Sequence, residues 1–500
     1  MVATKKPMVV IIGAGLAGLT AAHKLHTSTP SFDIRILEAG SRIGGRIRTA
    51  TFSGDRVETG ATWIHGIEGS PIHDLARSIG ALDSDGRPFE CMDPVPDEPI
   101  TVIPGNGTII EPRIVNPVTS LYKDMIAFGA DGGEGSVLGD TALKRCMEVV
   151  VDRLSVGRFL RSALEVYQEE NPSEEKLIEE AVFEIHENME RAHTAADDLG
   201  DLNFHTEREY KEFPGEQITI PVGYSSVIEW LASALPLGAI QLNRQVVKIE
   251  WQSSGSSDLS SSSHPVRIHT KDGALFHADH VIVTVSLGVL KAGIDSGGFF
   301  SPAVPQFKAG AIRSLGFGVV DKLFLQLGET YTDGFPSLQF AFDRLRKTEL
   351  PLWLQQMATL SPVYRGSRVL LGWFAGKEAL ALESLSEGEV LNGVETLMSS
   401  VPTLPQQPEF TSAMWTKWGT DPLFMGSYSY VSIGSSGEDF DRMAEPLPTV
   451  GENDEVGAAP PPLQVMFAGE ATHRSHYSTT HGAYFSGIRE AERLMKHYRI

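Results

Sequence analysis

The sequence predicts an α/β fold built on a parallel sheet whose strands come from distant parts of the chain. Residues 8–12 form an apolar, β-type run that meets a glycine-rich turn, and a helix-like stretch follows. A second strand-like run, residues 34–37, ends in Glu38. Strand, helix and second strand in this order indicate a βαβ unit at the start of the chain.

The glycine-rich turn carries the strongest functional signal. Gly13, Gly15 and Gly18 have the G-x-G-x-x-G spacing, which allows a tight turn, close approach of a pyrophosphate and close packing of helix and strand. The helix N-terminus then faces the phosphates, and Glu38, twenty residues after Gly18, can accept hydrogen bonds from ribose hydroxyls. A glycine turn between any strand and helix is the alternative, but the ordered elements favour a dinucleotide site.

The first 80 residues cannot complete a doubly wound sheet alone. Strand-like runs near 246–250, 281–285 and 464–468 are candidates to complete it. We therefore expect a discontinuous nucleotide domain from residues 1–80, 217–300 and 411–500, and an inserted α+β substrate domain from residues 81–216 and 301–410. In the insertion, residues 81–140 contain few periodic segments, whereas an apolar stripe at helical spacing lies within residues 172–193.

Composition narrows the class of protein. The 500 residues contain 42 Lys and Arg against 64 Asp and Glu, a net charge of −22. This charge argues against binding to a nucleic-acid backbone and suits a cationic small-molecule substrate. Acidity that serves only solubility is the alternative reading.

The two cysteines, Cys91 and Cys146, cannot form a disulfide framework and show no metal-ligand spacing, so we expect a reducing compartment and no metal. No apolar run is long enough for a bilayer, and the chain ends in H-Y-R-I, which is not a peroxisomal signal. We expect a cytoplasmic protein without a membrane partner. The sequence leaves the oligomeric state open, a monomer included.

A second glycine turn follows Glu38. In the run A-G-S-R-I-G-G-R-I-R (39–48), the turn can wrap a pyrophosphate, and Arg42 or Arg46 can supply charge-assisted hydrogen bonds. A basic surface loop is the alternative. NAD-dependent dehydrogenases do not require this extension, so the segment favours FAD over NAD.

Several motifs resemble those of the flavin amine oxidase family along nearly the whole chain. They are E-A-x-x-R-x-G-G-R (38–46), E-T-G-A-T-W-I-H-G (58–66), G-S-Y-S-Y (426–430), F-A-G-E-A-T (467–472) and T-H-G-A (480–483). Within the family, the sequence resembles the polyamine-oxidising members most. The resemblance implies a discontinuous FAD-binding, Rossmann-like domain with an inserted α+β substrate-binding domain.

The resemblance also implies which residues contact FAD. Glu470 follows a strand and a glycine at the carboxyl end of the sheet, where its carboxylate can hold hydroxyl groups of the cofactor; an acid at a helix N-terminus is the alternative. The helix near residue 481 can direct its positive end at the flavin. The remaining cofactor positions implied are Gly60, Ala61, Thr62, Trp63, Val247, Trp418, Gly482 and Ala483.

Lys322 is the first catalytic candidate. Val320 and Phe324 flank it on the same face of a strand, so we expect it to be buried with a lowered pKa. The resemblance implies that it holds a water molecule against flavin N5.

Tyr428 and Thr480 are the other catalytic candidates. The resemblance places Tyr428 beside the substrate amine, where an aromatic face attracts a cation, although a core tyrosine is the alternative. The resemblance places Thr480 at or near the position of a second tyrosine, which in monoamine oxidases forms an aromatic cage around the amine together with the first. Threonine leaves this cage more open. Ser427 replaces the cysteine that bonds flavin in monoamine oxidases, so we expect non-covalent FAD.

Substrate contacts are less clearly marked. His65 can hydrogen-bond a substrate nitrogen or only satisfy its own loop, and Tyr430 belongs to the active-site motif. A polyamine also needs carboxylates for its distal ammonium groups. Glu184, Asp198 and Asp201 are candidates, although each alone can be a surface acid.

We expect an FAD-dependent oxidase of spermine- or thermospermine-like polyamines. It would take hydride from the carbon beside a secondary amine to flavin N5 and give a shorter polyamine, an aminoaldehyde and H2O2, with O2 or another molecule as electron acceptor. A histone-lysine demethylase and a non-catalytic, polyamine-sensing flavoprotein are the alternatives.

Overall fold

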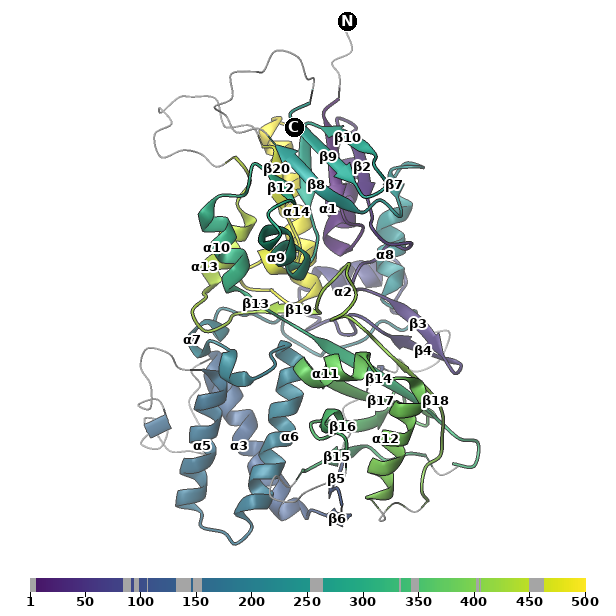
Figure 1. Ribbon diagram of the computed structural model, residues 1–500, viewed down its shortest axis with the longest axis vertical. Coiled ribbons are helices and arrows are strands. Elements are labelled where there is room, and N and C mark those ends of the chain that lie inside the picture. The colour runs from purple at the N-terminus through teal and green to yellow at the C-terminus, as the bar shows by residue number, and fades with distance from the viewer. Residues whose placement is uncertain are drawn as a thin grey trace, which may run out of the picture.

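The computed structural model describes residues 6–83, 91–93, 99–105, 107–131, 145–146, 155–251, 264–331, 334–342, 350–401, 404, 406–448 and 463–500. Figure 1 shows two lobes along the long axis. The upper lobe combines purple N-terminal, teal central and yellow C-terminal segments, and the lower lobe is blue and green. We call them the nucleotide lobe and the second lobe. No described helix is long and apolar enough to cross a membrane.

The nucleotide lobe is built on a parallel sheet in the order β20–β11–β1–β2–β7. Its strands are β1 (Met8–Ile12), β2 (Asp33–Leu37), β7 (Ile240–Gln241), β11 (His280–Val283) and β20 (Val465–Phe467). Helices α1 (Leu16–Ser28) and α14 (Thr480–His497) lie side by side, as Figure 1 shows, and share a core with the sheet. The predicted fold class, a discontinuous α/β sheet with an α+β insertion, is confirmed.

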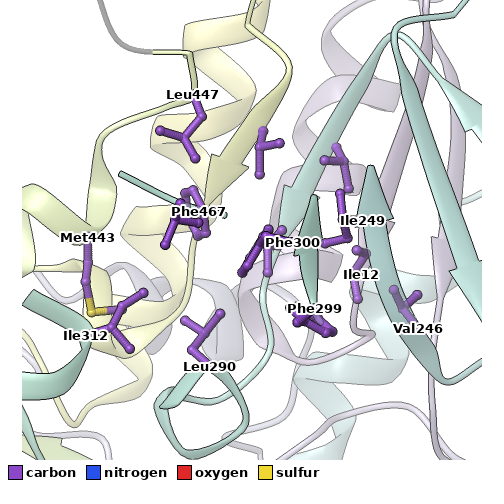
Figure 2. Packing of buried hydrophobic residues seen from close by; sticks show 14 of the residues in the cluster. Ile12, Val246, Ile249, Leu290, Phe299, Phe300, Ile312, Met443, Leu447 and Phe467 are labelled. Atoms are coloured by element: carbon purple, nitrogen blue, oxygen red, sulfur yellow. The ribbon is translucent and has the colours of Figure 1, made fainter. Parts of the chain in front are cut away.

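Alternation along β1 explains why both faces of this sheet are covered. Val9 and Ile11 pack with α1 and α14, whereas Val10 and Ile12 point into the opposite core. Figure 2 shows part of that second core, in which Ile12 lies near Ile249 and Phe300. Residues from the N-terminal, central and C-terminal parts of the chain therefore pack against this one strand.

The strand expected near 246–250 does not join the parallel sheet, which corrects the sequence prediction. It is β8 (Val246–Trp251), and it pairs with β9 (Val266–Thr270) and β12 (Phe300–Ser301) in a separate sheet that also contains β10 (Leu275–Ala278). Burial along β8 alternates, and Val247 is 43% exposed. A strand with one solvated face suits this outer sheet, whereas a parallel strand is buried on both faces.

The second lobe contains a mostly antiparallel sheet in the order β18–β14–β17–β16–β15–β5–β6. Its strands are β5 (Ile100–Ile103), β6 (Thr108–Ile109), β14 (Val320–Leu327), β15 (Leu338–Phe340), β16 (Thr359–Pro362), β17 (Val369–Ala375) and β18 (Phe410–Trp415). Helices α11 (Gly376–Glu383) and α12 (Glu387–Ser399) pack on it. Helices α3 (Pro112–Asp131), α5 (Val156–Glu170) and α6 (Lys176–Thr194) form a bundle beside it (Figure 1).

Short elements complete the described structure. A hairpin of β3 (Thr49–Phe52) and β4 (Asp55–Glu58) and the pair β13 (Gly316–Gly318) and β19 (Tyr428–Tyr430) lie between the lobes (Figure 1). The remaining helices are α2 (Pro71–Ser78), α7 (Phe204–Glu207), α8 (Ser225–Ser233), α9 (Leu287–Asp295), α10 (Gln306–Ser314) and α13 (Gly437–Ala444).

Helix α3 was missed from the sequence, which showed few periodic segments there. Ile114, Val118, Leu121 and Met125 form a buried stripe at helical spacing. Pro117 interrupts this pattern inside the helix, and a proline there usually predicts a helix end. The helix therefore owes its stability to packing of the stripe against α5 and α6.

The expected domain edges differ locally from the sheets. Strand β18 pairs with β14, so residues 411–415 belong to the sheet of the second lobe rather than to the nucleotide lobe. Val304, Ala309 and Ile312 pack into the core of the nucleotide lobe, although the sequence assigned them to the insertion. The other boundaries stay a prediction.

Substitution of Gly18 by alanine tests the packing of α1 on β1. A Cβ at Gly18 would lie 2.1 Å from the Gly13 carbonyl oxygen. We expect Gly18→Ala to lower the free energy of unfolding by about 2 kcal/mol. Gly310→Ala on α10 is the control, because nothing lies within 4 Å of its Cβ position, and it should raise stability by about 0.5–1 kcal/mol. Urea unfolding measures both, and equal effects of the two substitutions would contradict the packing role.

Lys308 predicts a pH dependence of stability. It is fully buried, donates to the Arg442 and Met443 carbonyls at 2.7 and 2.8 Å, and burial lowers its pKa to about 7. The unfolded chain, with an ordinary lysine pKa of about 10.4, then binds more protons between the two values, so stability rises with pH from about 7 to about 10. We expect Lys308→Met to reduce this slope by up to about 1.4 kcal/mol per pH unit. Exposed Lys271→Met is the control, and an unchanged slope in Lys308→Met would disprove the assignment.

Candidate active site

A cavity of about 2420 Å³ runs from the carboxyl end of the parallel sheet to the second lobe. It is more than twice as large as an ordinary ligand pocket, so it has room for more than one small molecule. Gly13, Gly15 and Glu38 line it in the nucleotide lobe, and Lys322 and Tyr428 line it at the second lobe. Residues far apart in the sequence therefore face one space.

Backbone without side chains forms the wall at the nucleotide end. Gly13, Gly44 and Gly45 have positive φ, and Gly44 N donates to Ala14 O at 2.8 Å. A Cβ on Gly45 would lie 3.2 Å from Gly15 Cα, so two glycine turns meet here. Glu38 accepts from Ala14 N and Gly40 N, each at 2.7 Å, which fixes its carboxylate beside the first turn.

Arg46 and Glu470 form an ion pair further along the cavity. Arg46 Nη1 lies 2.8 Å from Glu470 Oε1 and donates to Ser427 O at 2.7 Å. Glu470 is 5% exposed and also accepts from Ser429 Oγ and Ser478 N. Since Arg46 and Glu470 both line the cavity, their expected contacts with FAD stay open as predictions.

The N-terminus of α14 closes the cavity from the side of the nucleotide lobe. Thr480 and Ala483 line the cavity, and Tyr224 donates to the Thr480 hydroxyl. Gly482 does not line it; a Cβ there would lie 2.1 Å from His476 O, so this glycine allows the preceding loop to fold onto the helix. The helix directs unpaired N–H groups and its positive end toward the cavity.

Lys322 is buried as its apolar flanks predict, with 3% exposure. Its Nζ donates to the carbonyls of Glu58 and Gly60 at 2.6 and 2.7 Å and to the Thr62 hydroxyl. It also lies 4.6 Å from the centre of the Trp373 ring. Burial lowers the pKa of Lys322 to about 7, against the opposite effects of Glu58 and Asp93.

A network of polar groups surrounds this lysine. Trp373 Nε1 donates to Asp93 Oδ2 at 2.9 Å, and burial raises the pKa values of Asp93 and Glu58. Trp418 Nε1 donates to Thr59 O at 3.0 Å. Trp373, Trp418 and the 59–63 segment line the cavity together, so these bonds fix the wall around Lys322.

Tyr428 faces the cavity from β19, and its hydroxyl donates to the Ala192 carbonyl on α6. Burial, with Glu190 and Asp321 adding to it, raises the pKa of Tyr428, so the phenol stays protonated at neutral pH. The adjacent Ser427 exchanges two hydrogen bonds with the backbone of Val320, at 2.8 and 2.9 Å. Tyr430 also lines the cavity.

His65 and Trp63 line the cavity from the 58–66 segment. Burial lowers the pKa of His65 to about 4, with the nearby His193 adding to it, so the imidazole is neutral at pH 7. Its buried Nδ1 has no hydrogen-bond partner among the described residues. A neutral imidazole with an open nitrogen can bind a substrate N–H.

Several sequence-predicted residues do not line the cavity, and the three candidate substrate carboxylates are among them, so their role stays a prediction. Glu184 does not reach the cavity, Asp198 is exposed and accepts from Gly200 N at 2.7 Å as a local cap, and Asp201 is exposed. Gly18 serves packing. Val246 lines the cavity instead of Val247, whose side chain points outward, so the backbone role of Val247 stays a prediction.

The structure brings in residues that the sequence did not mark. Glu190, Tyr122 and Trp373 line the cavity. Met189, which belongs to the apolar stripe that the sequence shows within residues 172–193, is 43% exposed and lines it too. The spacing of apolar residues predicts which face of α6 is apolar. The position of the cavity, however, depends on the elements that pack around α6.

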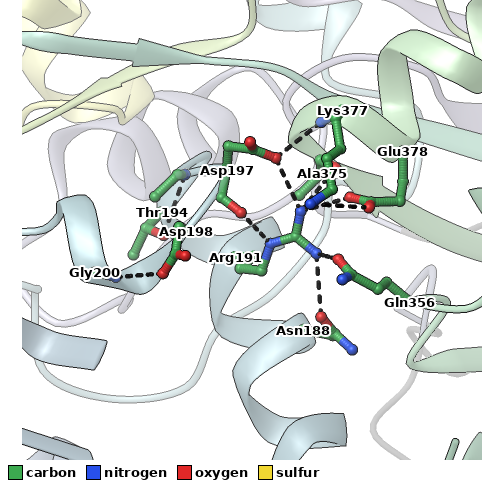
Figure 3. Close-up of polar contacts among 11 residues, drawn as sticks. Asn188, Arg191, Thr194, Asp197, Asp198, Gly200, Gln356, Ala375, Lys377 and Glu378 are labelled. Atoms are coloured by element: carbon green, nitrogen blue, oxygen red, sulfur yellow. Dashed lines mark hydrogen bonds and ion pairs between the residues drawn. The ribbon is translucent and has the colours of Figure 1, made fainter. Parts of the chain in front are cut away.

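Arg191 fixes the end of α6 from which Glu190 projects. Figure 3 shows its guanidinium surrounded by acceptors from two helices, two loops and the end of β17. It donates to Glu378 Oε2 at 2.6 Å and to Asp197 O at 2.7 Å, and it also bonds Gln356, Asn188 and the Ala375 carbonyl. The side chain of Arg191 is 8% exposed. The last turn of α6 is therefore held against α11.

The residues at the nucleotide end of the cavity fit FAD. The bare glycine backbone gives room for a pyrophosphate, Glu38 lies where a ribose would follow, and the N-terminus of α14 would face the ring system. Among the described residues, no group of histidines, cysteines and carboxylates is arranged to hold a metal ion.

Comparisons with known proteins agree with this site. Residues 16–495 match the family described as flavin containing amine oxidoreductase. The chain is 47% identical to "Probable polyamine oxidase 5" of Arabidopsis thaliana, over 99% of both chains. It is 43% identical to "Polyamine oxidase 1" of Oryza sativa subsp. japonica, over 99% of this chain and 98% of the relative. It is 32% identical to "Peroxisomal N(1)-acetyl-spermine/spermidine oxidase" of Bos taurus, over 98% and 94%.

The glycine turns, the cavity that they share with Lys322 and the family match over nearly the whole chain lead to one conclusion. The chain belongs to the flavin-containing amine oxidoreductase family, as the motifs predicted, and is an enzyme with FAD as its cofactor.

Proposed function

We propose that this enzyme is a polyamine oxidase that acts on a secondary amine of spermine- or thermospermine-like polyamines. One observation carries the proposal: a single cavity joins the nucleotide end to an end lined by Trp373, Tyr428 and carboxylates. Aromatic faces and carboxylates attract a slender polycation. The names of the three relatives support the same class of substrate.

The chemistry that FAD supplies when bound is acceptance of a hydride at N5 from the carbon beside an amine, with O2 or another acceptor later taking the electrons. The amine must be neutral at that moment, because an ammonium has no lone pair to form the imine. Water then hydrolyses the imine to an aminoaldehyde and a shorter polyamine, and O2 as acceptor gives H2O2.

The residues of the chain orient the substrate and control its protons. Trp373 and Tyr428 offer faces for the aliphatic chain, and neutral His65 can bind a nitrogen. Lys322, with a pKa of about 7, can exchange a proton with a nearby water molecule at neutral pH. Orientation in a water-poor site, rather than a strong base, is the contribution that we assign to the protein.

The cofactor is proposed to be non-covalent, since Ser427 cannot form a thioether and its hydroxyl is engaged with Val320. We also propose a cytoplasmic location, in keeping with two cysteines that form no disulfide. Release of intact FAD on denaturation and microscopy of a fluorescent fusion test these two points.

Anaerobic addition of spermine to the flavin-loaded enzyme tests the function. We expect the visible absorption of the flavin to bleach. A spectral shift without bleaching would instead indicate a polyamine sensor. Bleaching by a dimethyl-lysine peptide but not by spermine would indicate a demethylase. Product analysis with spermine and thermospermine identifies the bond that is cut.

Replacement of the buried lysine at the cavity predicts a kinetic change. We expect Lys322→Met to retain FAD and to slow turnover at least about tenfold, because its contacts with Glu58, Gly60 and Thr62 and its titrating proton are lost. Stopped-flow absorbance measures flavin reduction and reoxidation separately. Lys308→Met is the control, a buried lysine outside the cavity lining. Wild-type rates of both steps in Lys322→Met would refute the role.

A further inference from the structure

Glu190 is a carboxylate on the wall of the substrate end of the cavity. It lies in the last turns of α6, one residue before Arg191, and its side chain is 21% exposed. Successive helical residues point about 100° apart, so the turn that directs Arg191 into α11 directs Glu190 elsewhere, into the cavity. Figure 3 shows the hydrogen bonds and ion pairs of Arg191 that hold that turn in place.

In the structure, His193 is the partner of this carboxylate, and it is a cation when its imidazole is protonated. His193 Nδ1 lies 3.8 Å from Glu190 Oε2, one helical turn away, and both residues line the cavity. The side chain of His193 is 70% accessible. An accessible imidazole at this distance can turn away from the carboxylate by rotation of its own side chain.

The hydroxyl of Tyr122 is a second polar group at the cavity. Tyr122 on α3 is 4% exposed and lines the cavity, and its hydroxyl has no hydrogen-bond partner among the described residues. Burial raises the pKa of Tyr122 far above its usual value, and Glu190 and Glu187 add to this effect, so the phenol is neutral. A phenol oxygen accepts hydrogen bonds from an ammonium group.

We propose that Glu190 and Tyr122 bind a protonated nitrogen of the polyamine, and that His193 occupies Glu190 until the substrate replaces it. The proposal rests on the proposed function and specifies one substrate subsite. An ammonium group donates to both a carboxylate and a phenol oxygen, whereas a neutral or anionic group gains nothing from Glu190. The unpartnered hydroxyl and the weakly held histidine give the free protein a place for such a cation.

A pH dependence follows from this competition. His193 is faced by Glu190 on its own helix, by Glu212 in the 208–217 loop and by His65 in the 58–66 segment. Glu190 is faced by Tyr122 and Tyr428, both neutral. The nearby carboxylate of Glu190 raises the pKa of His193, so acid keeps the internal cation in place, and rising pH frees the carboxylate. Polyamine nitrogens, like lysine, keep their protons to higher pH.

The decisive measurement is the binding of substrate to Glu190→Gln. Anaerobic stopped-flow gives the apparent Kd for spermine and the limiting rate of flavin reduction. We expect the Kd to rise about tenfold, with the limiting rate within about twofold of wild type. Tyr122→Phe should raise the Kd by a smaller factor. Glu180→Gln, on the same helix but outside the cavity lining, is the matched control.

Calorimetry with 1,8-diaminooctane gives a readout without turnover, because this ligand has two ammonium groups and no secondary amine. Its affinity should fall in Glu190→Gln in parallel with that for spermine. His193→Gln should bind spermine more tightly than wild type at about pH 6 and should lose most of the change in Kd between about pH 6 and about pH 8.

The outcomes separate the two proposals. If spermine does not reduce wild-type flavin, the proposed function fails whatever Glu190 does. If spermine reduces the wild type and Glu190→Gln binds spermine and 1,8-diaminooctane as tightly as wild type, the subsite is refuted. An equal loss in Glu180→Gln, or a His193→Gln profile that matches wild type, would also overturn it.

Discussion

The burial of one ammonium group joins the two lobes at the place where the chemistry is expected. Lys322 belongs to the sheet of the second lobe, but its Nζ bonds the backbone of the 58–62 segment, which follows the β3–β4 hairpin. Burial of a cation costs free energy unless the cation is hydrogen-bonded. The contacts of Lys322 with the 58–62 segment therefore stabilise the positions of both. The same burial lowers its pKa to about 7, which gives the site a proton carrier near neutrality. Structure and chemistry therefore depend on the same contacts.

The cavity wall formed by the last turn of α6 is fixed in another way. Arg191 collects acceptors from α6, α11 and the loop with Gln356, and it leaves the cavity-facing residues of the same turn free for substrate. The Ala192 carbonyl in this turn also receives the hydroxyl of Tyr428. An arginine hub behind the wall can keep the turn rigid while Glu190 and His193 exchange partners in front of it.

The sequence marks the glycine turns of the nucleotide end more directly than the residues of the substrate end, for a physical reason. Gly13, Gly18 and Glu38 act through local backbone geometry, and such geometry leaves a fixed spacing in the sequence. Glu190 acts only because α3, α6 and β19 surround one cavity, and its spacing on α6 does not distinguish it from Glu184, which does not reach the cavity. Strand β7, with two residues, is too short to show any periodicity, whereas α3 was hidden by Pro117.

A polyamine oxidase must satisfy two opposite requirements on one substrate. The nitrogens far from the reacting bond have to be held as ammonium ions, and the reacting nitrogen has to be neutral. The cavity separates the two demands: by the proposals above, Glu190 attracts a cation, while Lys322 lies at the end where hydride would leave. A protonated Lys322 repels an ammonium close to it and so favours loss of the proton from the reacting amine. A substrate with several amines at fixed spacing can meet both conditions at once, whereas a monoamine meets only one, and the length of the polyamine then becomes the property that the cavity selects.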